Sequence, residues 1–391
     1  MPSYVRRVSV LLFCLLMQIG LGTNQAWSVF VKPLHDAYGY SAADLQKVFA
    51  LSTFVFCATL IIWGRLHDRY GPRVLGVCSA ILLAVGYLLT WKLGQHYGVL
   101  LVSVGVITSL GITAGYVCPL ATAMKWFPTH KGLVAGLAMA GFAGGPTILS
   151  NVVQWLLHSG WPVLEIFHLM LCVYPPLVLV CALNLITPEG SHAVTRPKVE
   201  YRAIFSDIRF WTLFVAMLVG SFCFLIVMGS AKPLATFFGL PELAAVQAIS
   251  VLAASNALAR VFWGGLLDRL GTKRSIFLAQ LCAVAGLTLL LTAGSVGPVF
   301  FVAVAGVAFC YASSFAVFPA TVARLYGLSV LGSIYPFIMM AQGISSIAPI
   351  INGTLVDRTH SYIPGLVLAL AVTVVGAIAC TLMARRAGDR L

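Results

Sequence analysis

An arginine lies deep within a long apolar stretch of this sequence. Arg260 occurs in the apolar run 243–266, and Asn256 precedes it by one helical turn. Side chains at positions i and i+4 share a helix face, so the two can point into one cavity. A guanidinium binds a carboxylate through two parallel hydrogen bonds, and its burial is costly unless a polar cavity or a partner receives it. Arg260 is therefore the first candidate for a functional site. The alternative is an arginine that is satisfied by backbone carbonyls or reaches the membrane interface.

Membrane-spanning helices are the elements that must position these side chains. The 391 residues are 60% apolar and 9% charged, whereas soluble domains contain about 25% charged residues. A helical span needs about 20 mostly apolar residues, and twelve such runs follow one another along the chain. We expect them at 8–31, 45–66, 74–92, 97–125, 131–157, 162–186, 210–232, 243–266, 275–293, 297–323, 328–352 and 361–384. The sequence therefore predicts an all-α membrane protein.

The excess of positive charge indicates orientation rather than a nucleic-acid partner. The formal net charge is +13, but lysine and arginine fall mainly in the short breaks between spans instead of on one soluble face. If both termini are cytoplasmic, the cations on the opposite side are Lys32, Lys47, Lys92, Lys232 and Arg358. The positive-inside rule then predicts a multi-pass protein of the inner (plasma) membrane, with both termini in the cytoplasm and the lipid bilayer as its surroundings.

The chain contains an internal duplication. The motif Gly-x-x-x-Asp-Arg-x-Gly at 264–271 occurs once before, at 64–71, displaced by 200 residues. A polar break from Thr187 to Phe210 separates the two halves. We expect an N-terminal six-helix bundle at 1–187, a cytoplasmic linker at 188–209 and a C-terminal six-helix bundle at 210–391. Parallel repeats of this kind place a substrate site between them near the bilayer midplane. A third Gly-x-x-x-Asp-Arg, at 353–358, falls on the opposite side of the membrane and carries little weight in this interpretation.

Glycine and proline are frequent inside the spans, as at Gly141, Gly144, Gly145 and Pro146. In membranes, small residues let helices approach closely, and glycine or proline permits bends. The sequence leaves open whether these residues bend the helices during a conformational change or only set their packing distance.

The duplicated motif resembles a known signature. Residues 64–74 resemble the signature of the loop between helices 2 and 3 in the major facilitator superfamily, and residues 264–274 resemble its second-half copy. The resemblance implies the major facilitator fold, with two six-helix pseudo-symmetric bundles. It also implies that the signature carboxylates and their flanking cations gate the cytoplasmic side: Asp68, Arg69, Arg73, Asp268 and Arg269. Alternatively, the cations set the topology and bind anionic headgroups.

Three further motifs resemble one branch of that superfamily, the oxalate/formate antiporters and monocarboxylate transporters. They are Trp126–Gly136, Trp27–Phe30 and Ser314–Pro319. The resemblance implies small carboxylate substrates such as lactate, pyruvate, formate and oxalate. It also implies an essential arginine in helix 8, and that position is occupied here by Arg260.

The same resemblance assigns other residues to the substrate cavity. Tyr311 and Phe315 correspond to aromatic cavity walls, although an aromatic pair one turn apart otherwise indicates packing. The further cavity positions implied are Asn24, Gln25, Tyr116 and Phe142. Gln342 occupies the place where the oxalate exchanger has a second cation. A single buried cation favours a monoanion, because an unpaired carboxylate in a low-dielectric cavity is costly.

Proton coupling has no obvious carrier in the sequence. Asn256 and Gln25 occupy positions where animal monocarboxylate transporters have an aspartate and a lysine, and the carboxylates of this chain fall near the ends of the spans. The substrate itself can carry the proton. His168 is a second candidate, because histidine titrates in the physiological range, although a lone histidine in an apolar helix otherwise indicates packing.

Together these observations predict a secondary active transporter that moves a small organic monocarboxylate by alternating access, as a monomer coupled to protons. The alternatives are a permease or exporter of a larger carboxylate-bearing compound such as a siderophore or drug, an anion exchanger, and a receptor that binds a carboxylate without moving it. An enzyme is not expected, because the sequence has no Walker-type motif, no His/Cys metal cluster and no acid–base pair at membrane depth. We expect no cofactor and no metal.

Overall fold

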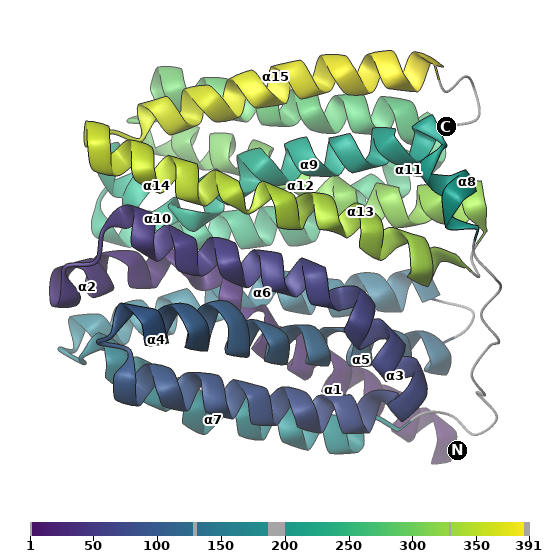
Figure 1. The fold of residues 1–391 in the computed structure, drawn as a ribbon, viewed down its shortest axis with the longest axis horizontal. Helices are drawn as coiled ribbons and strands as arrows, with labels where there is room; N and C mark the ends of the chain where they lie inside the picture. Colours follow the sequence, from purple (N-terminus) through teal and green to yellow (C-terminus); the bar gives the residue numbers. More distant parts are fainter. Residues whose placement is uncertain (1, 128–130, 187–199, 328–329, 387–391) are drawn as a thin grey trace. The chain divides into compact units, whose positions relative to one another are not determined.

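A computed structural model of the protein describes residues 2–127, 131–186, 200–327 and 330–386. Within these ranges the regular secondary structure is entirely helical. The helices are α1 (Pro2–Leu21), η1 (Gly22–Ala26), α2 (Ser28–Tyr38), α3 (Ala42–Leu93), α4 (Tyr97–Val102), η2 (Ser103–Thr108), α5 (Ser109–Trp126), α6 (Lys131–His158), α7 (Val163–Asn184), α8 (Tyr201–Phe205), α9 (Ile208–Gly229), α10 (Ala231–Phe237), α11 (Glu242–Ala293), α12 (Gly297–Tyr326), α13 (Leu331–Ser345), α14 (Ile347–Thr359) and α15 (Ile363–Arg386) (Figure 1).

Ten segments of the described residues are long and apolar enough to cross a membrane. The long helices α3 and α11 contain two spans each, and the others are α4–η2–α5, α7, α9, α12, α13–α14 and α15. The remaining two of the twelve expected spans are α6 and the segment α1–η1–α2, in which the 3₁₀ helix η1 interrupts the α-helix. The all-α fold of twelve membrane helices predicted from the sequence is confirmed.

The duplication is visible in the helix bounds. α3 covers 42–93 and α11 covers 242–293, so both helices begin and end 200 residues apart. Each bends at the last glycine of its signature, where Gly71 has φ 80° and ψ 172° and Gly271 has φ 73° and ψ 173°. Only glycine adopts this conformation without strain. The last glycine of each signature is therefore required by the turn that connects two consecutive spans.

Internal contacts divide the chain into two compact units. Unit 1 comprises Met1–Tyr40 and Leu51–Val194, and unit 2 comprises Ser41–Ala50 and Thr195–Leu391. The first turns of α3 thus belong to unit 2, although the rest of that helix belongs to unit 1. Residues 188–199 of the expected linker lie outside the described residues. The division into 1–187, 188–209 and 210–391 stays a prediction.

The glycines of α6 set a close helix packing distance. A Cβ atom at Gly145 would overlap the carbonyl oxygen of Ile19 in α1, and one at Gly141 would lie 2.8 Å from the Leu15 side chain. Across the same contact, a Cβ atom at Gly22 would overlap the carbonyl oxygen of Phe142. Of the two roles that the sequence left open for these glycines, the structure shows the packing role at Gly141 and Gly145.

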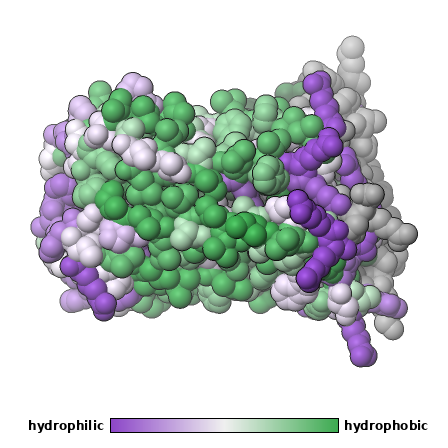
Figure 2. Space-filling model, turned by 90° about the horizontal axis from the view of Figure 1, so that it is seen from above, coloured by the Kyte–Doolittle hydropathy of each residue, from purple (hydrophilic) through white to green (hydrophobic). Residues whose placement is uncertain are grey.

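Apolar side chains dominate the outward faces of the helices. Figure 2 shows hydrophobic residues over the middle of the visible face and hydrophilic residues gathered near its two ends. Large side chains such as Leu243, Val261 and Val375 are strongly exposed. In a bilayer these side chains contact lipid tails, so their exposure carries no cost of the kind that it would carry in water.

Candidate functional site

Helix α11 turns Arg260 away from the lipid-facing surface. Arg260 is 7% exposed, whereas its neighbour Val261 is 72% exposed. The Arg260 Nε donates a hydrogen bond to Asn256 Oδ1 at 3.4 Å, and the guanidinium carbon lies 4.5 Å from the ring centre of Phe315 in α12. The helical spacing thus brings the two predicted polar groups together, and an aromatic face holds the cation by a cation–π contact.

Tyr311 is fixed from three sides in the same unit. Its ring stacks on Phe224 of α9 with 3.8 Å between centroids and 3° between planes, and it meets Phe315 edge-on at 5.0 Å. Its hydroxyl oxygen accepts a hydrogen bond from Gln342 Nε2 at 2.8 Å. The structure therefore brings Asn256, Arg260, Tyr311, Phe315 and Gln342 into one connected cluster of α11, α12 and α13.

Phe224 is a member of this cluster that the sequence analysis did not single out. It lies in an apolar helix whose composition gives no reason to choose one phenylalanine over another. Only the packing of α9 against α12 selects it, because it is the residue of α9 that reaches the Tyr311 ring.

One atom in each of two side-chain amides of the cluster is buried without a hydrogen-bond partner among the described residues. The two atoms are Asn256 Nδ2, a donor, and Gln342 Oε1, an acceptor. Leaving a buried polar atom unsatisfied costs about 1–3 kcal/mol. Beside the cation of Arg260, this donor and this acceptor are the groups that a small polar ligand would satisfy.

The predicted residues of unit 1 form a different kind of cluster. Tyr116 and Phe142 meet edge-on at 5.1 Å, and both also contact Phe56, at 5.1 and 6.2 Å between ring centres. The Tyr116 hydroxyl donates to Met139 Sδ at 3.1 Å. Phe56 was not predicted, and its aromatic character alone gave no signal. Tyr116 and Phe142 are buried and Phe56 is partly exposed; the cluster is largely apolar and offers a ligand shape rather than charge.

The two predicted positions in the first span lie in its helix break. Gln25 belongs to η1, and its Oε1 is buried without a hydrogen-bond partner among the described residues. Asn24 is its neighbour in η1, but its side chain lies outside the described part of the chain.

The predicted gating residues are placed only in part. The side chains of Asp68 and Asp268 lie outside the described part of the chain. The flanking cations Arg69, Arg73 and Arg269 are exposed, and the Arg69 guanidinium lies 5.2 Å from the Tyr70 ring centre. Their role in gating stays a prediction.

His168 occupies a half-exposed cluster near the start of α7. Its ring stacks on Trp91 at 3.8 Å with 5° between planes, and its Nδ1 lies 3.5 Å from Glu165 Oε2. The Trp91 Nε1 donates to the same carboxylate at 3.0 Å, and the side chain of His168 is 41% exposed. These contacts explain His168 as part of a half-exposed cluster. They give no support to the hypothesis that it is a buried proton carrier.

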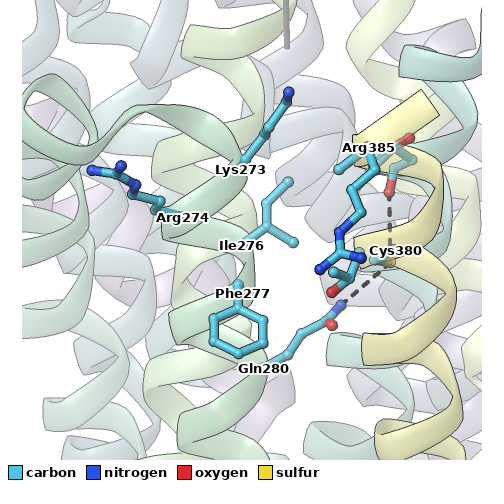
Figure 3. Close-up of a pocket in the computed structure, with 10 residues that line it drawn as sticks. Lys273, Arg274, Ile276, Phe277, Gln280, Cys380 and Arg385 are labelled. Atoms are coloured by element: carbon cyan, nitrogen blue, oxygen red, sulfur yellow. Dashed lines mark hydrogen bonds between the residues drawn. The ribbon is translucent and has the colours of Figure 1, made fainter. Parts of the chain in front are cut away.

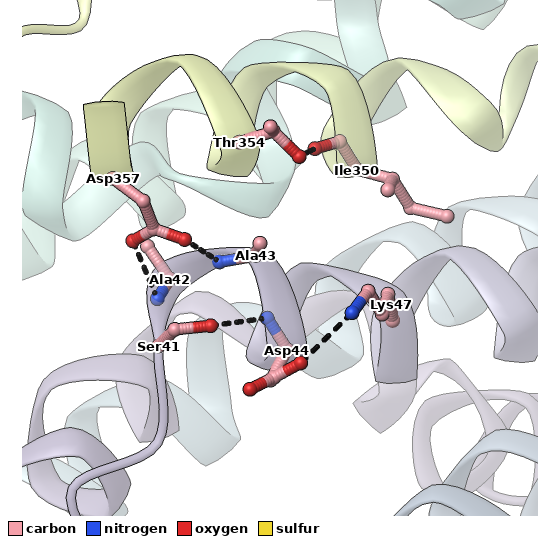
Figure 4. A network of polar contacts seen from close by, with 8 residues as sticks. All are labelled: Ser41, Ala42, Ala43, Asp44, Lys47, Ile350, Thr354 and Asp357. Carbon is pink, nitrogen blue, oxygen red and sulfur yellow. Dashed lines mark hydrogen bonds and ion pairs between the residues drawn. The ribbon is translucent and has the colours of Figure 1, made fainter. Parts of the chain in front are cut away.

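The third Gly-x-x-x-Asp-Arg motif makes a defined contact within unit 2. The two oxygens of Asp357 accept hydrogen bonds from the backbone N–H groups of Ala42 and Ala43, at 3.0 and 2.9 Å, at the first turn of α3 (Figure 4). A Cβ atom at Gly353 would lie 2.8 Å from the Cα of Ala43. The glycine of this motif lets α14 approach α3, and its carboxylate caps the positive end of that helix.

The family of the chain follows from a comparison with known sequences. The sequence profile of the Major Facilitator Superfamily matches residues 9–350. The chain belongs to this superfamily. It is 27% identical over 355 residues to the uncharacterized MFS-type transporter YhjX of Escherichia coli K12, and the match covers 88% of each chain. It is also 24% identical over 346 residues to the oxalate:formate antiporter of Oxalobacter formigenes, with 87% of this chain and 81% of the antiporter covered.

A solved structure of another superfamily transporter has the same fold. The nucleoside transporter NupG superposes with a TM-score of 0.73 at 13% identity, over 97% of this chain and 98% of NupG. At this identity the likeness shows the fold alone. As a member of the major facilitator superfamily, the protein is a multi-pass membrane protein and a secondary transporter.

Proposed function

We propose that this superfamily member transports a small organic monocarboxylate by alternating access, with Arg260 as the anchor for the carboxylate. The observation that carries the proposal is the buried cation of Arg260 beside two unsatisfied amide atoms, Asn256 Nδ2 and Gln342 Oε1. A carboxylate would accept hydrogen bonds from the guanidinium and from Asn256, and a hydroxyl or carboxylic proton on the substrate would reach Gln342.

The substrate class is supported by a relative as well as by geometry. The oxalate:formate antiporter of Oxalobacter formigenes is named for two carboxylates. In this chain Gln342 is neutral and is already hydrogen-bonded to Tyr311, so it cannot pair a second carboxylate as a cation would. We therefore favour a monoanion over a dianion, because a second buried carboxylate would lack a counter-charge.

Neutralisation of Arg260 by the bound anion couples substrate binding to closure of the cavity. An empty carrier must enclose an uncompensated charge when the cavity closes, whereas a loaded carrier encloses a neutral pair. We propose that a proton is transported together with this anion. We further propose a monomer of the inner membrane with both termini in the cytoplasm, gated by Asp68, Arg69, Arg73, Asp268 and Arg269.

Uptake into proteoliposomes tests this proposal. Labelled lactate, pyruvate, formate and oxalate are supplied with and without an inward proton gradient, to the wild type, Arg260→Lys and Arg260→Gln. We expect gradient-driven uptake of a monoanion, with kcat/KM lower by about 100-fold in Arg260→Gln, or about 2.7 kcal/mol. Arg260→Lys should keep part of the activity, because it retains the charge but loses the bidentate fork.

The control variant is Arg386→Gln, which removes an exposed arginine from the end of α15. It should transport like the wild type. Normal uptake by Arg260→Gln, or no movement of any of the four anions, would overturn the assignment of Arg260 to a small monocarboxylate.

A second candidate is a permease or exporter of a larger carboxylate-bearing compound, or an anion exchanger. The buried residue Met339 lies one turn before Gln342 in α13, and methionine adapts to ligands of different shape. Competition by carboxylates of increasing size would separate a small from a large substrate. An obligate exchanger would take up labelled anion only into vesicles preloaded with unlabelled anion, and counterflow would be absent in a receptor that binds without moving its ligand.

A further inference from the structure

A basic cavity opens in unit 2, away from the cluster around Arg260. It has a volume of about 220 Å³ and lies between α11 beyond its bend, α15 and α9. Lys273, Arg274 and Arg385 line it, together with the apolar side chains of Ile276 and Phe277 (Figure 3). None of the residues that line it is acidic. The cavity therefore combines three cations with an apolar wall at the end of three membrane spans.

The floor of the cavity is a fixed structure. Gln280 Nε2 donates to Cys380 Sγ at 3.5 Å, and the Cys380 thiol points to the Thr212 carbonyl oxygen at 3.9 Å. These contacts join α11, α15 and α9 below the cations. Figure 3 shows the Arg385 side chain extending from α15 toward Gln280, so its guanidinium lies over the cavity. Arg274 and Arg385 have no acidic partner within the described residues.

Unit 1 lacks these features at the corresponding positions. The positions that match Arg274 and Arg385, 200 residues earlier, are Val74 and Leu185, whereas Lys273 is matched by Arg73. The position that matches Ile276 is Gly76, and a Cβ atom there would overlap the Ala182 side chain of α7. In unit 1 the helices therefore pack closely where unit 2 has a cavity. If the extra cations of unit 2 only set the membrane topology, nothing would gather them at the cavity.

We propose that this cavity binds an acidic phospholipid, with the headgroup phosphate against Arg385, while Arg274 and Lys273, whose side chains point away from Arg385 in Figure 3, add positive charge around the site. The acyl chains would then lie along Phe277, whose side chain is exposed on the outer face of α11. Basic pockets between membrane helices bind acidic lipid headgroups, and arginine pairs with a phosphate in bidentate geometry. The site is independent of the transported substrate.

Native mass spectrometry of the delipidated full-length protein tests the proposal. Dioleoyl phosphatidylglycerol, dioleoyl phosphatidylcholine with the same acyl chains, and inorganic phosphate are titrated separately. We expect phosphatidylglycerol to bind at least about fivefold more tightly than phosphatidylcholine, and each cation removed to weaken it about fivefold. Arg385→Gln should show this loss once, and the double variant Arg274→Gln/Arg385→Gln should show it twice.

Two further variants make the result specific. Arg386→Gln removes the next arginine of α15, which does not line the cavity, and should leave phosphatidylglycerol binding within about twofold of the wild type. Ala384→Phe fills the cavity without changing the charge, and should weaken phosphatidylglycerol binding. Equal binding of the two lipids, equal losses in Arg385→Gln and Arg386→Gln, or competition by inorganic phosphate at the lipid's own concentration would each overturn the lipid assignment.

Discussion

The two repeats carry opposite chemistry at equivalent positions. Leu60 in α3 and Arg260 in α11 are 200 residues apart, and each is 7% exposed. The neighbouring positions differ in the same sense, with Phe56 and Phe142 in unit 1 against Asn256 and Gln342 in unit 2. The fold of unit 1 is built with apolar residues at all three positions. The polar residues of unit 2 are therefore not required by the fold, and their retention at a cost in stability points to a function.

The ends of the fourth helix of each repeat also differ. In unit 1 the Arg6 guanidinium lies 5.9 Å from the ring centre of Trp126. In unit 2 the Tyr326 hydroxyl donates to Asp207 Oδ2 at 2.8 Å, and Arg209 pairs with the same carboxylate at 2.8 Å. One repeat thus fastens this end with a cation on an aromatic ring, and the other with a titratable carboxylate.

Placing a charge in unit 1, at the position equivalent to Arg260, should have the largest effect on stability. Leu60→Arg buries a cation among the apolar side chains of unit 1, and we expect it to cost about 3–5 kcal/mol of stability. Thermal unfolding in detergent, followed by labelling of the seven buried cysteines as they become exposed, measures the change. Leu60→Met is the matched control and should cost less than about 1.5 kcal/mol. If Leu60→Arg melts like the wild type, unit 1 is polar at this position and the contrast between the repeats fails.

Removing the charge from unit 2 should stabilise the protein instead. Arg260→Gln eliminates a desolvated cation, and we expect the free energy of unfolding to rise by about 1–2 kcal/mol while transport is lost. The same labelling assay measures stability on the protein used for uptake. A variant that loses both stability and transport would show that Arg260 supports the fold, and the functional assignment would lose its main support.

Gly264 and Gly271 of the unit 2 signature distinguish a conformational requirement for glycine from a steric one. A Cβ atom would meet no atom within 4 Å at Gly264 or at Gly271, but only Gly271 has a positive φ. We expect Gly271→Ala to cost about 1–3 kcal/mol through backbone strain, and Gly264→Ala, in regular helix, to be neutral or slightly stabilising. Gly71→Ala should repeat the loss in unit 1. Equal effects of Gly264→Ala and Gly271→Ala would contradict a backbone origin.

Local patterns predicted much of this molecule, and long-range contacts could not be predicted. The spans, the duplication and the pairing of Asn256 with Arg260 follow from hydropathy, motif spacing and the helical repeat. The Phe224–Tyr311 stack depends on which face of α9 meets α12, and a uniformly apolar helix does not encode that choice in its pattern. The contact between Asp357 and the start of α3 joins residues more than 300 positions apart. Its motif carries little weight in the sequence because it falls on the opposite side of the membrane from the two signatures.

The carboxylate of Asp207, the N-cap of α9 that contacts the end of α12, makes unit 2 sensitive to acid. Burial raises the pKa of Asp207, but hydrogen bonds from Arg209 and Tyr326 lower it by more, so the pKa lies below its ordinary value. The stabilisation is therefore present above the unfolded pKa of about 4 and is lost as the pH falls through the lower folded pKa. We expect Asp207→Asn to cost about 1–2 kcal/mol at pH 7. As the pH falls through the folded pKa, its melting temperature should approach that of the wild type.

The matched variant in unit 1 is Arg6→Gln, which removes the cation over Trp126. This contact contains no carboxylate, so the difference from the wild type should stay constant between pH 3 and 7. A parallel pH dependence in the two variants would show that the acid sensitivity does not arise from Asp207.

The smallest effect is expected where α14 caps α3. Asp357→Asn removes the charge from two hydrogen bonds to the first turn of α3, and we expect a loss of about 1 kcal/mol. Gly353→Ala should separate the same two helices, because its Cβ atom would lie 2.8 Å from the Cα of Ala43. If both residues act through one contact, the double variant should cost less than the sum of the two single variants. Additive losses would mean that the carboxylate and the glycine act independently, and Asp36→Asn, at an exposed ion pair, should change stability by less than either.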